Sequence, residues 1–69
     1  MKDIQITLAA ARVNAGLTQS QVADRLHVGK QTIVNWEKGK TEPQIKQARA
    51  LSEIYNMPLD FIFLPSESD

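Results

Sequence analysis

The stretch LTQSQVADRLHVGKQTIVNWEKGKTEP, residues 17–43, contains the start, turn and end signals of two consecutive helices. Thr18 and Gln21 have the spacing of a capping box, in which each side chain binds the backbone N–H of the other residue. A helix therefore begins at Thr18, and its apolar residues recur on one side, at Val22, Ala23 and Leu26.

A three-residue turn, residues 27–29, connects this helix to a second one that runs from about Lys30 to Lys38. Gly39 ends the second helix, because glycine adopts the left-handed conformation at a helix end without steric cost. Successive helical residues lie about 100° apart around the axis, which places Ile33 and Trp36 on the inward side. The outward side then consists of Lys30, Gln31, Val34, Asn35 and Lys38.

The outward side has the chemistry of a nucleic-acid reader. Gln31 and Asn35 each offer an acceptor and two donors from one amide, which matches the N6/N7 edge of adenine. Lys30 can reach guanine acceptors or a phosphate, and Val34, expected to be exposed, suits a thymine methyl. The plainer interpretation is a solvated polar face, as on most surface helices. Two helices around a short turn favour the reader, because this arrangement pushes the second helix into a major groove.

Helices also account for the rest of the chain, since no sustained alternation or hairpin dipeptide indicates a strand. We predict a first helix from about Asp3 to Asn14, a fourth with Pro43 in its first turn, and a short fifth from Pro58 to Leu64. The fourth helix buries a stripe of Ile45, Ala48, Leu51 and Ile54. The predicted fold is all-α: a compact bundle of five short helices in residues 1–64, followed by a disordered acidic tail in residues 65–69.

Composition limits the class of protein. A chain of 69 residues forms one small domain. It has no cysteine and one histidine, His27, so we expect no disulfide, no metal site and no cofactor. No apolar run approaches the roughly 18 residues of a membrane span, and we expect a cytoplasmic protein without a membrane partner.

The net charge of zero conceals a basic central region. Between residues 12 and 49 there are seven basic and three acidic residues, a local net charge of +4. Salt screens charges that are more than about 10 Å apart, so the local charge decides the attraction to a polyanion. The composition is therefore compatible with nucleic-acid binding.

An enzyme that binds nucleotide phosphates is the alternative suggested by the letters GKQT, residues 29–32. A phosphate-binding loop requires G-x-x-x-x-G-K-[ST] after a strand. Here Asp24 occupies the first glycine position, Gln31 replaces the serine or threonine, and a helix precedes the segment. No nucleophile–base pair is visible either, and we expect no enzymatic activity.

Residues 17–43 resemble the helix-turn-helix of the lambda-repressor-like family, also called the Cro/repressor or XRE family. The run LSEIYNMPLDFI, residues 51–62, is similar to that family's fourth and fifth helices. The resemblance implies a sequence-specific regulator of transcription that binds double-stranded DNA, a repressor of the phage or mobile-element type. The matching positions are Gln19, Ala23, Ile33, Trp36, Glu37, Gly39 and Pro43.

The resemblance also assigns roles to individual residues. Ala23 is the small residue needed where the two helices cross closely. Base contacts fall to Lys30, Gln31 and Asn35, with Val34 as a fourth reader. Phosphate contacts fall to Arg12, Thr18, Gln19, Lys38 and Lys40.

Glu37 stands near the end of its helix, where the helix dipole and a nearby phosphate both repel a carboxylate. In the family an arginine from the first helix compensates this residue, and Arg12 occupies the matching position. We predict an Arg12–Glu37 ion pair that also directs Arg12 at a phosphate; an unrelated surface acid is the alternative.

His27 and Gly29 depart from the family. The family usually has glycine where this chain has His27, and it often has serine or threonine where this chain has Gly29.

The apolar segment MPLDFIFLP, residues 57–65, has more apolar surface than one short helix buries. Relatives often dimerise through this end, and we predict a homodimer on a palindromic operator; packing within the chain is the alternative. The contacts would come from Tyr55, Phe61, Phe63 and Leu64. Other functions left open are an antitoxin with a toxin as partner, a restriction-modification controller, and a protein that binds an RNA-polymerase subunit.

Overall fold

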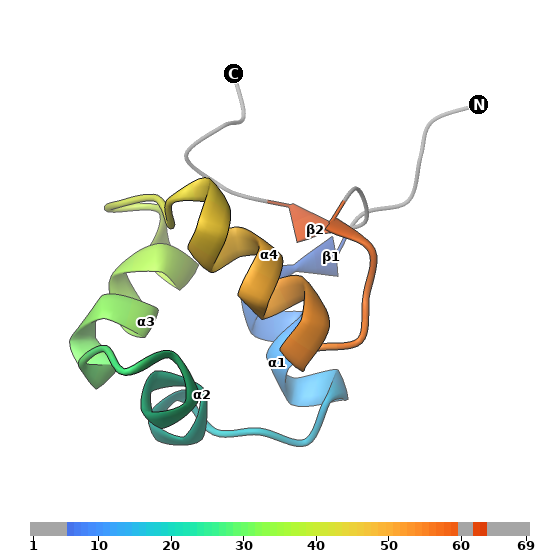
Figure 1. Ribbon diagram of the computed structural model, residues 1–69, viewed down its shortest axis with the longest axis horizontal. Helices are drawn as coiled ribbons and strands as arrows, with labels where there is room; N and C mark the ends of the chain where they lie inside the picture. Colours follow the sequence, from blue (N-terminus) through green and yellow to red (C-terminus); the bar gives the residue numbers. More distant parts are fainter. Residues whose placement is uncertain (1–5, 60–61, 64–69) are drawn as a thin grey trace.

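The computed structural model describes residues 6–59 and 62–63 of the chain. In this part four helices follow one another, with a short strand before and after them. Figure 1 shows α2 and α3 at one end of the molecule, α4 in front of α1 in this view, and the two strands side by side next to α1. The elements are β1 (Ile6–Thr7), α1 (Leu8–Asn14), α2 (Gln19–Leu26), α3 (Lys30–Lys38), α4 (Ile45–Ile54) and β2 (Ile62–Phe63).

β1 and β2 form a parallel pair, in which Ile6 lies opposite Ile62 and Thr7 opposite Phe63. The first helix therefore starts at Leu8, after a strand, and the expectation that the chain has no strand is wrong. The predicted fifth helix is also wrong, because Ile62–Phe63 is a strand and the described residues contain four helices. Isoleucine and phenylalanine favour extended backbone, and an isolated helix of a few residues is marginal in water. Pairing with β1 supplies backbone hydrogen-bond partners to this segment.

The predicted capping box at the start of α2 is confirmed. The Gln21 N–H donates to Thr18 Oγ1 at 3.1 Å, and the Thr18 N–H donates to Gln21 Oε1 at 2.8 Å. At α1, Thr7 Oγ1 likewise accepts from the Ala10 N–H at 3.0 Å. These bonds satisfy N–H groups that a helix leaves without partners in its first turn.

α4 differs from the prediction at its start. The helix begins at Ile45 with Gln44 as its N-cap, so Pro43 lies before the helix and not in its first turn. Pro43 is buried, whereas Ile45 is 64% exposed and does not belong to the buried stripe in which we expected it. Ile45 is the first residue of α4, and it projects beyond the part of the helix that packs on the core, at Ala48 and Leu51.

The four helices end in the same way, each with a residue in the left-handed conformation. This residue and the next one donate to carbonyls of the last turn, which is the Schellman motif. At α3, the Gly39 N–H donates to Trp36 O at 3.2 Å and the Lys40 N–H donates to Asn35 O at 2.9 Å. The motif reverses the chain within a few residues and keeps the connections short. The left-handed residues are Gly16, His27, Gly39 and Asn56, with φ of 75°, 58°, 78° and 53°.

The core lies where the four helices meet. The predicted inward residues of α3 are confirmed, since Ile33 is 1% and Trp36 is 4% exposed. Burying a side chain of the size of Ile33 stabilises a protein by about 1.5–3 kcal/mol, so these two residues fix the position of α3. The core residues are Leu8, Ala11, Val22, Ala23, Ile33, Trp36, Leu51 and Tyr55.

Replacing His27 by glycine should stabilise the protein. His27 is exposed and holds φ at 58°, a conformation that costs a residue other than glycine about 1 kcal/mol. We expect His27→Gly to raise the free energy of unfolding by about 0.5–1 kcal/mol in urea denaturation. Arg25→Gly is the control: Arg25 is exposed within α2, where glycine should lower the free energy of unfolding by about 1 kcal/mol. A loss of stability in His27→Gly would show that the imidazole makes a stabilising contact.

Candidate nucleic-acid interface

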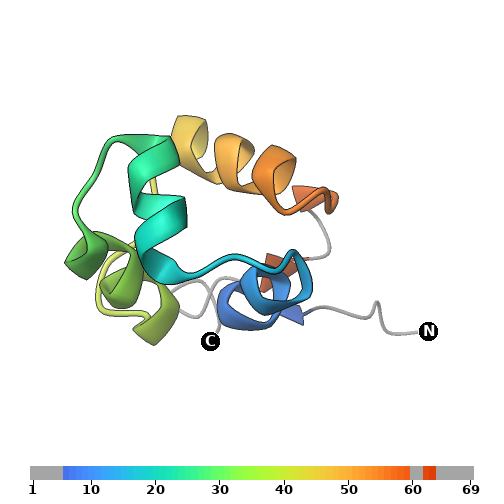
Figure 2. The ribbon, with the colours of Figure 1, turned by 90° about the horizontal axis from the view of Figure 1, so that it is seen from below.

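α2 and α3 pack on each other through the core. Ala23 of α2 belongs to the same buried cluster as Ile33 and Trp36 of α3. Figure 2, which looks onto α2, shows α3 on one side of it and α1 and α4 on the other. The inward side of α3 is thus covered, and its opposite side remains available to a ligand.

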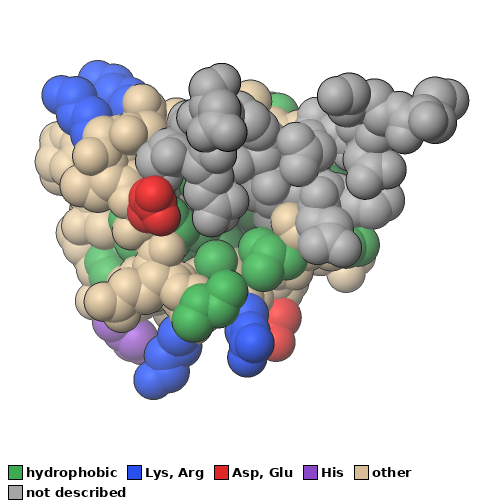
Figure 3. All heavy atoms as spheres, turned by 90° about the horizontal axis from the view of Figure 1, so that it is seen from above, with side chains coloured by type: hydrophobic (Ala, Val, Ile, Leu, Met, Phe, Trp, Pro, Cys, Tyr) green, Lys and Arg blue, Asp and Glu red, His purple; other side chains and the backbone are tan. Residues whose placement is uncertain are grey.

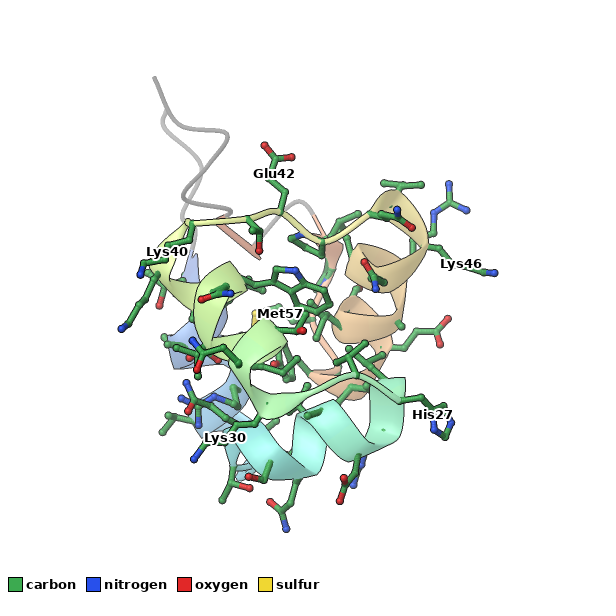
Figure 4. All side chains as sticks on the ribbon, turned by 90° about the vertical axis from the view of Figure 1, so that its left-hand side faces the viewer. His27, Lys30, Lys40, Glu42, Lys46 and Met57 are labelled. Atoms are coloured by element: carbon green, nitrogen blue, oxygen red, sulfur yellow. The ribbon has the colours of Figure 1, made fainter. Side chains whose placement is uncertain are left out.

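Two lysines, one at each end of α3, project from the same side of the molecule, which we call the open side. In Figure 4, Lys30 at the start of α3 and Lys40 after its end project from one side, whereas His27 and Lys46 project from the opposite side. On the face seen in Figure 3, basic side chains likewise form separated groups and not one continuous patch. The basic side chains therefore lie in several separate regions of the surface, and Lys30 and Lys40 project from the same side.

The four residues predicted to contact bases are Lys30, Gln31, Val34 and Asn35, and we call them the reading edge. Lys30 and Gln31 are exposed, while Asn35 is partly buried. Val34, expected to be exposed, is also partly buried. The Gln31 amide donates a hydrogen bond to Asn35 Oδ1 at 3.1 Å. Sequence reasoning treated these two amides as independent and missed this bond, although a spacing of four residues in a helix permits it.

Arg12 and Glu37 form the ion pair that the sequence predicted. Arg12 Nε donates to Glu37 Oε2 at 2.7 Å, and Nη2 donates to Oε1 at 3.3 Å. Arg12 Nη1 donates to the Leu17 carbonyl oxygen at 3.0 Å, and Gln19 Nε2 donates to Glu37 Oε1 at 2.9 Å. We call these four residues the Arg12–Glu37 cluster. It joins α1, α2 and α3 at a single carboxylate.

The cluster is largely shielded from water, since the side chains of Arg12 and Glu37 are 16% and 8% exposed. The hydrogen bonds to Glu37 raise the pKa of Arg12, against the opposing effect of burial. Burial, and then the negative charge of Glu37, raise the pKa of Tyr55 to about 12. Arg12 therefore stays charged, and the Glu37 carboxylate near the end of α3 has a permanent counter-charge.

Gln19 was predicted to contact a phosphate, and the structure places its amide against Glu37. One amide hydrogen is used in that bond, so the other amide hydrogen and the backbone N–H remain for an anion. The Glu37 contact was not predicted, because the family resemblance pairs Glu37 with Arg12 and no local sequence pattern relates Gln19 to a residue of another helix. Thr18 is exposed and its hydroxyl accepts from Gln21, which leaves the hydroxyl hydrogen free to donate.

The remaining predicted site residues fall into two groups. Lys38 and Lys40 are exposed, at the end of α3 and just after it. Among the predicted dimer contacts, Tyr55 is 3% exposed and belongs to the core, so its side chain does not form a surface for a second copy. Phe63 lies in β2, and Phe61 and Leu64 lie outside the described residues.

Residues 6–59 and 62–63 contain no group of three or more histidine, cysteine or acidic residues that could hold a metal ion. None of the helices described is long and apolar enough to cross a membrane.

Replacing Arg12 tests how much the Arg12–Glu37 cluster contributes to the free energy of unfolding. Arg12→Met leaves a shielded carboxylate without its counter-charge, and we expect the free energy of unfolding to fall by about 3 kcal/mol. Arg12→Met/Glu37→Gln should recover part of this loss, because no charge is then left unpaired and Gln19 keeps an acceptor. Arg25→Met, at an exposed arginine, should change the free energy by less than about 0.5 kcal/mol. Urea denaturation measures all three, and a double variant less stable than Arg12→Met would contradict this role.

Comparison with known sequences identifies relatives for almost the whole described region. A family model described as helix-turn-helix matches residues 8–62. An uncharacterised HTH-type transcriptional regulator of Archaeoglobus fulgidus is 34% identical over 58 residues, 84% of this chain and 82% of that protein. The cryptic phage CTXphi transcriptional repressor RstR of Vibrio cholerae is 33% identical over 58 residues, 84% of this chain and 52% of the repressor. The HTH-type transcriptional regulator ImmR of Bacillus subtilis is 33% identical over 55 residues, 80% of this chain and 43% of ImmR.

These relatives are named as regulators of transcription and not as enzymes. The chain spans most of the archaeal protein but only about half of RstR and less of ImmR. No solved structure gives a significant match. Because the family match covers α1, α2, α3 and α4, the chain belongs to the lambda-repressor-like, or Cro/C1-type (XRE), helix-turn-helix family of transcriptional regulators.

Proposed function

We propose that this protein binds double-stranded DNA at specific sequences and regulates transcription, as a repressor of the phage or mobile-element type. The observation that carries the proposal is the reading edge on the open side of α3. Ile33 and Trp36 hold α3 from the inside, and Glu37 ties its last turn to the Arg12–Glu37 cluster. A helix held in this way enters a major groove as a rigid element, and its amides meet the edges of bases.

Contacts to the phosphate backbone flank the reading edge in this proposal. Lys40 projects from the same side of the molecule as Lys30, beyond the end of α3 (Figure 4). The first turn of α2 offers the Gln19 backbone N–H and the second hydrogen of its amide, at the positive end of a helix. Such contacts supply most of the affinity and fix the register, whereas base contacts select the sequence.

The assignment as a repressor draws on a relative. RstR is named a transcriptional repressor of a cryptic phage. A protein that occupies an operator overlapping a promoter excludes RNA polymerase from the same DNA. This mechanism needs DNA binding alone, which is the activity that the reading edge supports.

We further propose that two copies bind a palindromic operator, with their α3 helices in successive major grooves. A single reading edge of four residues contacts only a few base pairs, and a two-fold pair doubles the length of the recognised sequence. Selection of bound duplexes from a random library by the full chain tests this arrangement. The expected product is an inverted repeat whose half-site centres lie about 10 base pairs apart. Enrichment of a single half-site would overturn the dimer, and enrichment of no sequence would overturn specific DNA binding.

Two lysines allow a matched test of the DNA-facing side. Lys40→Ala should weaken binding to every duplex and reduce the slope of log affinity against log salt by about one unit, because one phosphate contact is lost. Lys46→Ala removes the same charge from another exposed lysine that projects from the opposite side (Figure 4), and it should leave the slope unchanged. Fluorescence anisotropy at several salt concentrations measures both. Equal effects would mean that binding depends on total charge, and the proposed face would be wrong.

A further inference from the structure

The two amides of the reading edge are bonded to each other. Gln31 Nε2 donates to Asn35 Oδ1 at 3.1 Å. The residues stand four positions apart in α3, where side chains one turn apart meet. Gln31 is exposed and Asn35 is partly buried, so a base edge can still reach both groups.

This hydrogen bond makes two chemically similar side chains present different groups. A side-chain amide has two N–H donors and a carbonyl oxygen with two lone pairs. Gln31 gives one N–H to the bond and keeps a donor beside its free Oε1 acceptor. Asn35 accepts this N–H with its Oδ1, which leaves Nδ2, with two donors, for a base edge. The pair therefore offers one mixed edge and one edge of donors only.

We propose that Gln31 reads adenine, that Asn35 reads guanine, and that the hydrogen bond between them sets this assignment. The inference rests on the proposed DNA-binding function and specifies its target. In the major groove adenine shows a donor at N6 and an acceptor at N7, which complement the mixed edge of Gln31. Guanine shows two acceptors, N7 and O6, which complement the Asn35 amino group. Turning either amide alone by 180° brings two like groups together and breaks the bond.

The geometry of the helix limits where the two bases lie. Four residues of α-helix advance by about 6 Å, and base pairs follow one another at about 3.4 Å along the duplex. The adenine and the guanine therefore belong to base pairs that are adjacent or separated by one pair. Each half of the operator should contain both.

The test compares base preferences of the full chain and three variants, each by selection from random duplexes. The unchanged chain should select adenine at one position and guanine within two base pairs of it. Gln31→Ala should abolish the adenine preference. It should also reduce the guanine-over-adenine ratio at the second position roughly ten-fold, because the freed Asn35 amide can present either edge.

Asn35→Asp gives the sharper readout. Aspartate keeps an acceptor for Gln31 and removes both donors, so the adenine preference should persist while the second position changes from guanine to cytosine, whose N4 amino group donates to a carboxylate. Lys46→Ala, at an exposed lysine that projects from the opposite side of the molecule (Figure 4), should leave both preferences unchanged. Urea denaturation of each variant verifies folding, and ratios between sequences are compared because the added charge weakens all DNA binding.

The outcomes separate this inference from the function on which it rests. If the unchanged chain selects no sequence, both are wrong. If it selects a defined site but Gln31→Ala leaves the second position unaltered, DNA binding stands and the coupling between the amides is wrong. Loss of guanine in Gln31→Ala and of adenine in Asn35→Asp would show the opposite assignment and overturn the proposal.

Discussion

The carboxylate of Glu37 sits near the C-terminus of α3, where the helix dipole disfavours it, and only 8% of the side chain is exposed. Arg12 from α1 and Gln19 from α2 bring three donors to it within 3.3 Å. Leaving such a charge unpaired costs several kcal/mol, so arrangements of the three helices that separate these residues are disfavoured. Together with the buried Ile33 and Trp36, this group sets the position of α3 and with it the reading edge.

Short connections are the second condition for this arrangement. A turn of three residues between α2 and α3 requires the chain to leave α2 in the left-handed conformation at His27. The backbone of this turn still has hydrogen-bond partners, because the Val28 N–H donates to the Ala23 carbonyl oxygen at 3.0 Å. Gly39 performs the same reversal after α3, and Lys40, which follows it, projects from the same side as Lys30. The helix ends thus place charged residues as well as connecting the elements.

The sequence predicted those features that depend on local signals or on a resemblance to a known family. The bounds of α3 follow from its turn and Gly39, the burial of Ile33 and Trp36 from helical periodicity, and the Arg12–Glu37 pair from resemblance to a family. It did not predict β1 and β2, because strands of two residues have too little pattern to recognise and their partners stand 56 positions apart. The Gln19–Glu37 hydrogen bond was not predicted either, because it exists only once α2 and α3 are packed on each other.

The pairing of Gln31 with Asn35 separates specificity from affinity in the proposed complex. An amide that rotates freely must lose that freedom on binding, and it accepts a wrong base by turning over. An amide already held by its neighbour at 3.1 Å loses less, and a wrong base then faces a like group instead of a complement. Lysines such as Lys40 add attraction that is equal for all sequences and is weakened by salt. In this proposal discrimination rests on two uncharged side chains, so a net charge of zero is compatible with the selection of one DNA sequence over another.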